Sequence, residues 1–223
     1  MKEAPDMNTL VIRLALLALL ALLLVMTTQS YAANPLVKFT TSEGEMIFEL
    51  YPEKAPRTVA NFLHYVNNGF YQGTIFHRAV EQFVVQGGGL TPDFEYKTTL
   101  DPIPNESNNG LRNEPGTLAM ARLYEPDTAT SQFYINLSDN KYLNFHSPEP
   151  KYQGYCVFGK VVLGLDVAKK ISRLPTGPGG PFEADVPAKP VLIQQAELIA
   201  ALPIIAAPAP PSTHSSNPKK RKG

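Results

Sequence analysis

Short apolar runs rich in β-branched and aromatic residues recur between residues 37 and 199, and they restrict the fold more than any other feature. Residues 37–51 alternate apolar and polar side chains around the break Ser42-Glu43-Gly44-Glu45, which predicts a hairpin with glycine in its turn. Most of residues 74–89 also has the composition of a buried strand, and three glycines end it. Further strands are expected at residues 116–121, 131–137, 155–162 and 191–199.

Only two segments show the helical period. In residues 55–69 apolar side chains recur every three or four positions, Pro56 falls in the first turn and Gly69 follows the last, which predicts a helix with defined ends. Residues 164–174 show the same periodicity. Many strands with two helices favour a closed antiparallel sheet over an alternating strand–helix array, so the expected fold class is mainly β.

The remaining segments differ in composition. Residues 90–115 are rich in Pro, Asn and Gly, which predicts a long, ordered surface loop. Residues 202–223 begin with Ala and Pro and end in Lys-Lys-Arg-Lys-Gly, which predicts a disordered tail. The basic end favours a solvated terminus, and binding to an anionic membrane surface is the alternative.

The N-terminal segment has the order of a secretory signal. Residues 14–26 are an unbroken apolar run, with Arg13 before it and Ser30-Tyr31-Ala32 after it. The run is shorter than the roughly 20 residues of a membrane span. We expect a signal peptide over residues 1–32, cleaved after Ala32, and an uncleaved anchor is the alternative. Acidic residues before Arg13 leave both Met1 and Met7 as starts.

Cysteine and charge narrow the possibilities further. Cys156 is the only cysteine, so no disulfide can form within the chain. Its apolar strand context predicts a buried, unreactive thiol. Residues 33–218 have a net charge of about −4, which argues against nucleic acid as a partner.

The sequence lacks the residue patterns of several common functional sites. The histidines (His64, His77, His146 and His214) do not lie at metal-ligand spacing with one another or with Cys156, so neither a metal nor another cofactor is expected. No G-x-S-x-G elbow supports a hydrolase. The glycines at 87–89 lack the spacing and the following helix of a phosphate loop, which leaves a tight turn or a close backbone approach as their explanation.

One charged residue interrupts the apolar run of the second strand segment. Strand alternation would place Phe76, Arg78 and Val80 on one face. Composition alone favours a buried ion pair of Arg78 with Glu81 or an aspartate. A functional role for Arg78, together with Gln86 on the same segment, is the alternative.

Three ordered motifs point to a family. FHRAVEQFVVQGGG, LAMARLYEPDTATSQFYINLSDN and YCVFGKVVLGLDVAKKI resemble the signature blocks of the cyclophilins, which are peptidyl-prolyl cis-trans isomerases. The resemblance runs from about residue 35 to 199, so the expected domain covers residues 33–201. It implies a closed eight-stranded antiparallel β-barrel capped by two α-helices. The MAR form, the NNGLRNEPGT stretch and the signal peptide resemble the periplasmic branch of Gram-negative bacteria.

The resemblance also implies site residues. Arg78 matches the essential arginine, and Gln86, the glutamine of QGG, is expected to orient either the guanidinium or the substrate carbonyl. The residues expected to bind substrate are Phe83, Val84, Ala121, Arg122, Gln132, Tyr134, Tyr142, Leu143 and Tyr155. Ala121 and Arg122 would act through their backbone. Met120, Arg122 and residues 124–130 are expected near the subsite for the residue before proline.

The sequence departs from the family pattern at three aromatic positions. Tyr134 replaces a usual Phe, Tyr142 stands where many members have Trp, and Tyr155 replaces a common His. The chain contains no Trp. Because the indole helps the family bind cyclosporin, we expect weak cyclosporin sensitivity and an intact isomerase activity.

The expected function is therefore rotation about X–Pro bonds in exported proteins, without a covalent intermediate. The expected partners are unfolded or extended proline-containing polypeptides in the periplasm. We expect a monomer that does not insert stably in the membrane after signal cleavage. A proline-binding chaperone, whose catalysis is incidental, is the alternative function.

Overall fold

The computed structural model describes Val11 and residues 33–203. Contacts divide the chain into residues 1–34 and residues 35–223, and all named strands belong to the second unit. The predicted signal peptide, apart from Val11, and the tail beyond Pro203 lie outside the described residues. Within the described part of the chain, no helix has both the length and the apolar character needed to cross a bilayer.

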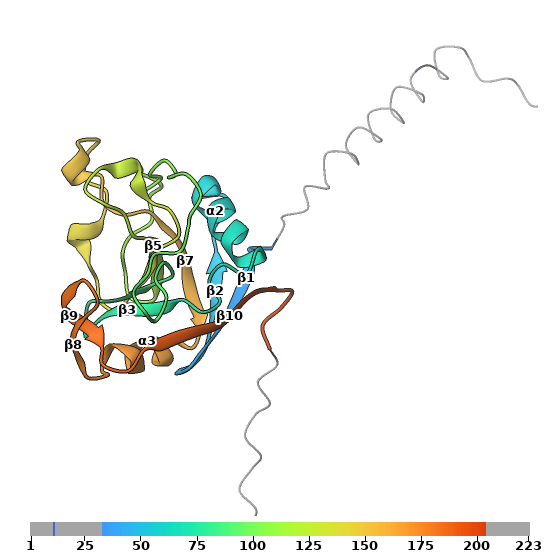
Figure 1. Ribbon diagram of the computed structural model, residues 1–223. Helices are drawn as coiled ribbons and strands as arrows, with labels where there is room; N and C mark the ends of the chain where they lie inside the picture. The colour runs from blue at the N-terminus through green and yellow to red at the C-terminus, as the bar shows by residue number, and fades with distance from the viewer. Residues whose placement is uncertain (1–10, 12–32, 204–223) are drawn as a thin grey trace, which may run out of the picture. The chain divides into compact units, whose positions relative to one another are not determined.

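Eight of the strands in residues 33–203 close into an antiparallel barrel with the order β1-β10-β3-β4-β6-β5-β7-β2. This confirms the fold class that the sequence predicted (Figure 1). The barrel strands are β1 (Leu36–Thr41), β2 (Gly44–Leu50), β3 (Ile75–Val80), β4 (Val84–Gly87), β5 (Thr117–Met120), β6 (Phe133–Asn136), β7 (Val157–Leu163) and β10 (Val191–Ile199).

The two predicted helices are α2 (Pro56–Asn67) and α3 (Leu165–Ser172), at opposite ends of the barrel in Figure 1. Helix α2 starts with Pro56 in its first turn, where the missing N–H costs nothing. Gly69 follows the C-cap residue Asn68 and has a left-handed φ of 64°. The Phe70 amide then donates to the Tyr65 carbonyl at 3.0 Å, which completes a Schellman cap.

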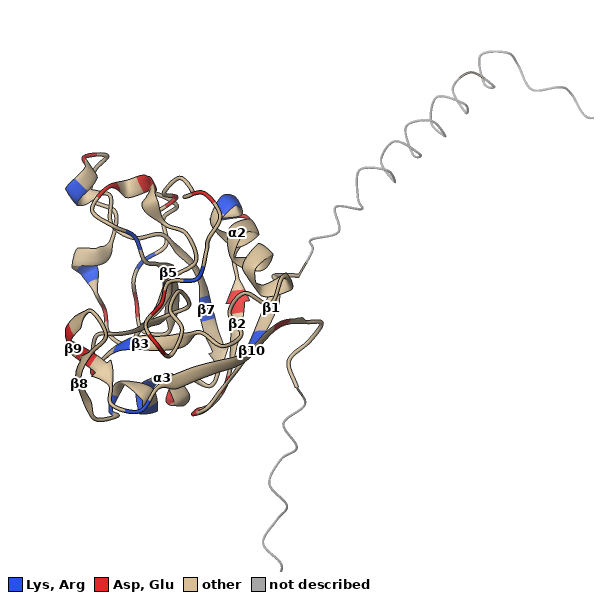
Figure 2. Cartoon of the chain, viewed as in Figure 1, with Lys and Arg blue, Asp and Glu red and all other residues tan. Residues whose placement is uncertain are grey.

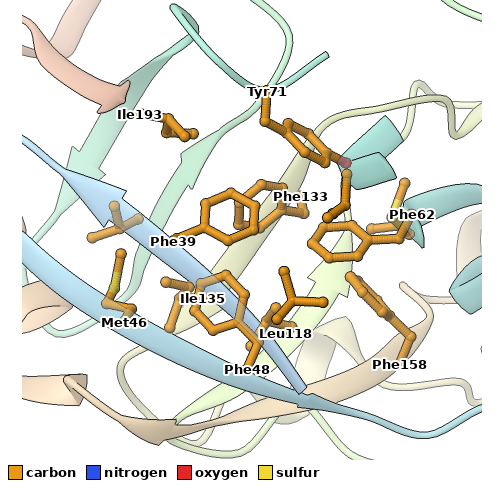
Figure 3. Close-up of a cluster of buried hydrophobic side chains, with 14 of the residues drawn as sticks. Phe39, Met46, Phe48, Phe62, Tyr71, Leu118, Phe133, Ile135, Phe158 and Ile193 are labelled. Atoms are coloured by element: carbon orange, nitrogen blue, oxygen red, sulfur yellow. The ribbon is translucent and has the colours of Figure 1, made fainter. Parts of the chain in front are cut away.

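The barrel interior is packed with aromatic rings (Figure 3). The Phe133 ring of β6 lies 5.5 Å, centre to centre, from the rings of Phe39 and Phe62. Phe62 comes from α2 and also meets Phe158 of β7 at 5.0 Å, so the helix contributes to the barrel core. Because these rings fill the interior, a ligand has to bind on the outside of the barrel wall.

The Cys156 side chain is 3% exposed, which confirms the predicted buried thiol. Burial raises its pKa to about 12, because the thiolate would lose its hydration. The thiol also lies 3.5 Å from the Thr58 hydroxyl of α2. Cys156 is therefore a packing residue whose thiol stays protonated near neutral pH.

The segment at residues 74–89 differs from the prediction in a way that explains Arg78. It forms two strands, β3 and β4, joined by a tight turn in which Gln82 has a φ of 59°. Phe76 pairs with Gly87 and Arg78 with Gln86, so two steps along β3 oppose one along β4. This β-bulge reverses the expected facing, and the prediction that Phe76 and Arg78 share a face is wrong. Phe76 is in the core, and Arg78 is on the outer wall.

A hairpin that was not predicted from the sequence is formed by β8 (Thr176–Gly179) and β9 (Phe182–Pro187). Its segment, TGPGGPFEADVP, is rich in Gly and Pro, which ordinarily indicates a loop. The hairpin is a separate two-stranded sheet, and β9 packs against β3 of the barrel. Three short 3-10 turns complete the described elements: η1 (Pro126–Thr128), η2 (Lys141–Leu143) and η3 (Pro150–Tyr152).

Candidate active site

A small cavity on the outer barrel wall collects most of the predicted site residues. Its volume is about 120 Å³, roughly four times the share of one liquid water, ≈ 30 Å³. It is lined by Arg78, Phe83, Val84, Gln86, Ala121, Arg122, Tyr134, Leu143 and Tyr155. The residues come from five separate parts of the sequence, so the cavity exists only in the folded barrel.

The floor of the small cavity is a second apolar cluster, distinct from the barrel core. Val84 of β4, Tyr134 of β6 and Leu143 of η2 are all at least nine-tenths buried within it. Ala119 and Val157 lie beneath them. Alternation along β4 produces both clusters, since Val85 points into the barrel core and Val84 points outward.

Arg78 lies at the rim of the small cavity with its side chain 38% exposed. The guanidinium carbon is 5.4 Å from the centre of the Phe83 ring, and Nε is 3.6 Å from an Asp185 carboxylate oxygen. The expected buried ion pair is therefore a half-exposed pair with an aspartate. Glu81 instead pairs with Arg173 at 2.9 Å.

Tyr134 turns its ring toward the cavity and its hydroxyl away from it. The hydroxyl donates to Asn113 Oδ1 at 2.8 Å. Asn136 Nδ2 donates to the same oxygen at 3.1 Å, and Asn113 in turn donates to the Leu143 carbonyl at 3.0 Å. Burial raises the pKa of Tyr134 well above its ordinary value, so the ring stays neutral and the cavity wall stays apolar.

Gln86 is oriented by a neighbour other than Arg78. Its Nε2 donates to Gln132 Oε1 at 3.1 Å, although Arg78 is its partner in the strand register. A Cβ on Gly89 would lie 2.5 Å from Gln132 Cγ, so only glycine leaves room for this pair. The glycines at 87–89 thus serve close approach, one of the two explanations that the sequence left open.

Arg122 is held by backbone acceptors. Its Nε donates to the Gly154 carbonyl at 2.9 Å, and its Nη1 donates to the carbonyls of Leu123 and Tyr124, both at 2.8 Å. The guanidinium carbon also lies 4.6 Å from the centre of the Tyr155 ring. Arg122 therefore stiffens this rim of the cavity.

Two predicted binding residues lie beside the small cavity, outside its lining. Tyr142 is 66% exposed and stacks on Phe83 with ring centres 6.0 Å apart. Gln132 lines an adjoining larger cavity of about 510 Å³. The two cavities share Gln86, Ala121 and Arg122, so together they form one continuous candidate binding surface.

The larger cavity includes residues that the sequence analysis did not assign to the site. His77 lines it, stacked on Phe182 of β9 at 5.3 Å. Desolvation, aided by the Arg78 charge, lowers the pKa of His77 to about 4. Of the residues expected near the subsite for the residue before proline, Arg122 lines this cavity, whereas Met120 is buried in the barrel core. The strand pattern gave no signal for Phe182, because its hairpin was not predicted.

The arrangement offers one permanent hydrogen-bond donor beside an apolar recess. Arginine stays protonated at every ordinary pH, and neither the buried thiol nor the neutral His77 is placed as a nucleophile against it. Such a site can bind an apolar ring and stabilise an electron pair that develops next to it. It is not equipped for hydrolysis through a side-chain triad.

Comparisons with known proteins identify the family of the chain. A family model described as "Cyclophilin type peptidyl-prolyl cis-trans isomerase/CLD" matches residues 36–198. Peptidyl-prolyl cis-trans isomerase A of Dickeya dadantii is 51% identical over 163 residues, covering 73% of this chain and 84% of that protein. Peptidyl-prolyl cis-trans isomerase B of Escherichia coli is 48% identical over 159 residues, covering 71% of this chain and 96% of that protein.

A solved structure is also similar. The crystal structure of a Cryptosporidium parvum cyclophilin type peptidyl-prolyl cis-trans isomerase, in the presence of dipeptide Ala-Pro, matches with a TM-score of 0.55. Its sequence identity is 26%, and the match covers 74% of this chain and 99% of that one.

Proposed function

Because the chain belongs to the cyclophilin-type peptidyl-prolyl cis-trans isomerases, we propose that Arg78 and the small cavity beside it catalyse rotation about X–Pro bonds during the folding of exported proteins. The observation that carries the proposal is the position of the Arg78 guanidinium at the rim of a recess floored by Val84, Tyr134 and Leu143. The recess accepts the proline ring, and Arg78 faces the bond that turns.

The reaction explains why the site needs a hydrogen-bond donor and does not need a nucleophile. Rotation about a peptide bond meets a barrier of about 18–20 kcal/mol because amide resonance is lost. No covalent bond forms or breaks. In the twisted transition state the prolyl nitrogen regains a lone pair, which neither ground state presents. A donor aimed at that nitrogen stabilises the transition state selectively, and selective stabilisation is the requirement for catalysis.

One hydrogen bond from Arg78 is not enough by itself. A charged hydrogen bond contributes about 1.5–3 kcal/mol in ordinary contexts, whereas enzymes lower barriers by at least ~8 kcal/mol. The apolar floor strengthens the field of the guanidinium by excluding water. Holding the proline ring while the preceding carbonyl swings supplies a further share through orientation.

The larger cavity is the place for residues before the proline. It adjoins the small cavity through Gln86, Ala121 and Arg122, so an extended peptide can occupy both. Gln86 donates to Gln132 and is turned toward this junction. Of its two expected roles, contact with the substrate carbonyl fits this geometry better than support of Arg78.

The proposed setting is the periplasm, supported by the signal-like order of residues 1–32. Fractionation of cells that express the full chain tests it: the proposal predicts a processed protein in the periplasmic fraction, and a full-length cytoplasmic protein would overturn it. The proposal includes weak cyclosporin sensitivity, because Tyr142 stands where many family members have Trp. Tight, stoichiometric inhibition would contradict that part.

The experiment that tests the substrate class is an NMR exchange measurement on an Ala-Pro peptide. Catalytic amounts of the protein should bring cis–trans exchange, ordinarily tens to hundreds of seconds, into the range of seconds or faster. Unchanged exchange would refute the proposal for such substrates. A chaperone function separate from isomerisation predicts that suppression of aggregation survives Arg78→Ala, and its loss together with catalysis would leave the isomerase function alone.

A further inference from the structure

The hairpin β8–β9 is docked on the strand that carries Arg78. Phe182 of β9 stacks on His77, the residue immediately before Arg78, with ring planes only 22° apart. Val186 of the same strand is 5% exposed. In Figure 1, β9 lies beside the end of β3, in agreement with the contacts between these strands. The hairpin is thus fixed to the edge of the proposed site.

Within this hairpin, Asp185 has an uncommon backbone conformation. Its φ is 67°, a left-handed value that costs energy for residues other than glycine and is best tolerated by Asn and Asp. It falls where β9 carries more residues than β8 between the paired positions. Such conformations persist when the surrounding structure enforces them, and here Phe182 and Val186 fix the strand on both sides of Asp185.

The Asp185 carboxylate reaches Arg78 at a specific atom. Oδ2 lies 3.6 Å from Nε, and the two side chains are 42% and 38% exposed. Figure 2 shows acidic positions along β9 in the same part of the fold as the basic position on β3. A contact at Nε keeps the two Nη nitrogens for the substrate, while the Phe83 ring supports the guanidinium at 5.4 Å.

We propose that Asp185 is a positioning residue that holds the Arg78 guanidinium in its catalytic orientation from the β8–β9 hairpin. The proposal rests on the proposed function of Arg78. A half-exposed ion pair adds little to fold stability, so its effect should fall on the rate of the chemical step. Long arginine side chains have many rotamers, and a carboxylate at Nε together with the ring of Phe83 restricts them.

The test compares Asp185→Asn with a matched control, Glu183→Gln. Asparagine keeps the size and tolerates the left-handed backbone. Glu183 is exposed on the same strand and forms no ion pair within residues 33–203. Glu183→Gln therefore removes the same charge as Asp185→Asn without breaking an ion pair. Asp185→Asn should lower kcat for a neutral proline peptide by about three- to tenfold, with KM within twofold and an unchanged Tm. Glu183→Gln should leave kcat unchanged.

Salt provides a second measurement, whose main effect is expected in the wild type. Raising the salt concentration screens a half-exposed pair, so kcat of the wild type should fall toward that of Asp185→Asn, which should stay constant. Equal kcat for wild type and Asp185→Asn, equal losses in both variants, or parallel salt curves would overturn the proposal. If Arg78→Ala retains full activity, the function assigned to Arg78 fails. If Arg78→Ala loses activity and Asp185→Asn retains full activity, the function of Arg78 stands and the positioning role of Asp185 fails.

Discussion

The guanidinium carbon of Arg78 lies 5.4 Å from the centre of the Phe83 ring, across the tight turn that joins β3 to β4. The contact places the permanent charge beside the apolar recess and gives one side chain two tasks. Phe83 lines the recess and also stacks against the guanidinium.

Two substitutions separate the tasks of Phe83. Phe83→Leu keeps most of the apolar surface and removes the ring, so kcat/KM should fall by about two- to fivefold, the value of an exposed cation–π contact. Phe83→Ala also removes the wall for the proline ring and should cost about tenfold or more. The isomerase assay on folded variants measures both effects. Equal kcat/KM for Phe83→Leu and wild type would show that the ring stacking contributes nothing.

The Gln86–Gln132 hydrogen bond predicts coupled effects. Gln86→Ala should lower kcat/KM because the amide no longer meets the substrate. Gln132→Ala should produce part of the same loss by releasing Gln86. The free-energy loss in the double variant should be smaller than the sum of the losses in the two single variants, since both glutamines act through one contact. Strict additivity in this mutant cycle would mean that the two glutamines act independently.

The Tyr134 hydroxyl should matter for stability and not for catalysis. Tyr134→Phe removes the bond to Asn113, which still accepts from Asn136, so the free energy of unfolding in urea should fall by about 1 kcal/mol. Because the hydroxyl points away from the recess, kcat/KM should stay within twofold. A large loss of activity at unchanged stability would place the hydroxyl in the reaction.

His77 predicts a pH dependence of stability. Its pKa is about 4 in the fold and near 6.5 when unfolded, so between these values the unfolded chain binds the proton more readily. The contribution of neutral His77 to the free energy of unfolding is fully present above pH 6.5. It is lost as the pH falls to 4, a difference of about 3 kcal/mol. His77→Phe keeps a ring against Phe182 and lacks the titration.

Urea unfolding at pH 7 and pH 4 tests the role of His77. Wild type should lose more stability than His77→Phe over this interval. Equal losses in the two proteins would show that His77 is not held neutral by the fold.

Periodicity predicted both helices and the barrel strands other than β3 and β4, which it merged into one strand, because these elements bury one face against a single core. It could not predict the bulge at His77, which depends on how β3 pairs with β4. As a result, strand alternation placed Arg78 on the same face as Phe76. The β8–β9 hairpin was missed because its Gly and Pro residues have the composition of a loop. Phe182 and Asp185 were therefore missed with it.

The proposed binding residues were accessible to sequence analysis only through the motif resemblance. Nothing in the local pattern of Val84, Tyr134 or Leu143 distinguishes an outward-facing apolar residue from one in the core. Their shared recess depends on contacts between β4, β6 and η2, which lie up to about 60 positions apart in the chain. The stack of Tyr142 on Phe83 is equally long-range.

The most direct test of the account is the kcat/KM of Arg78→Ala for an Ala-Pro peptide, with the fold verified by circular dichroism and Tm. The account predicts a native fold and a loss of about a hundredfold or more, because the donor to the prolyl nitrogen is absent. Arg78→Lys should recover little, since an ammonium lacks the planar fork. A folded Arg78→Ala protein with wild-type kcat/KM would contradict the central claim.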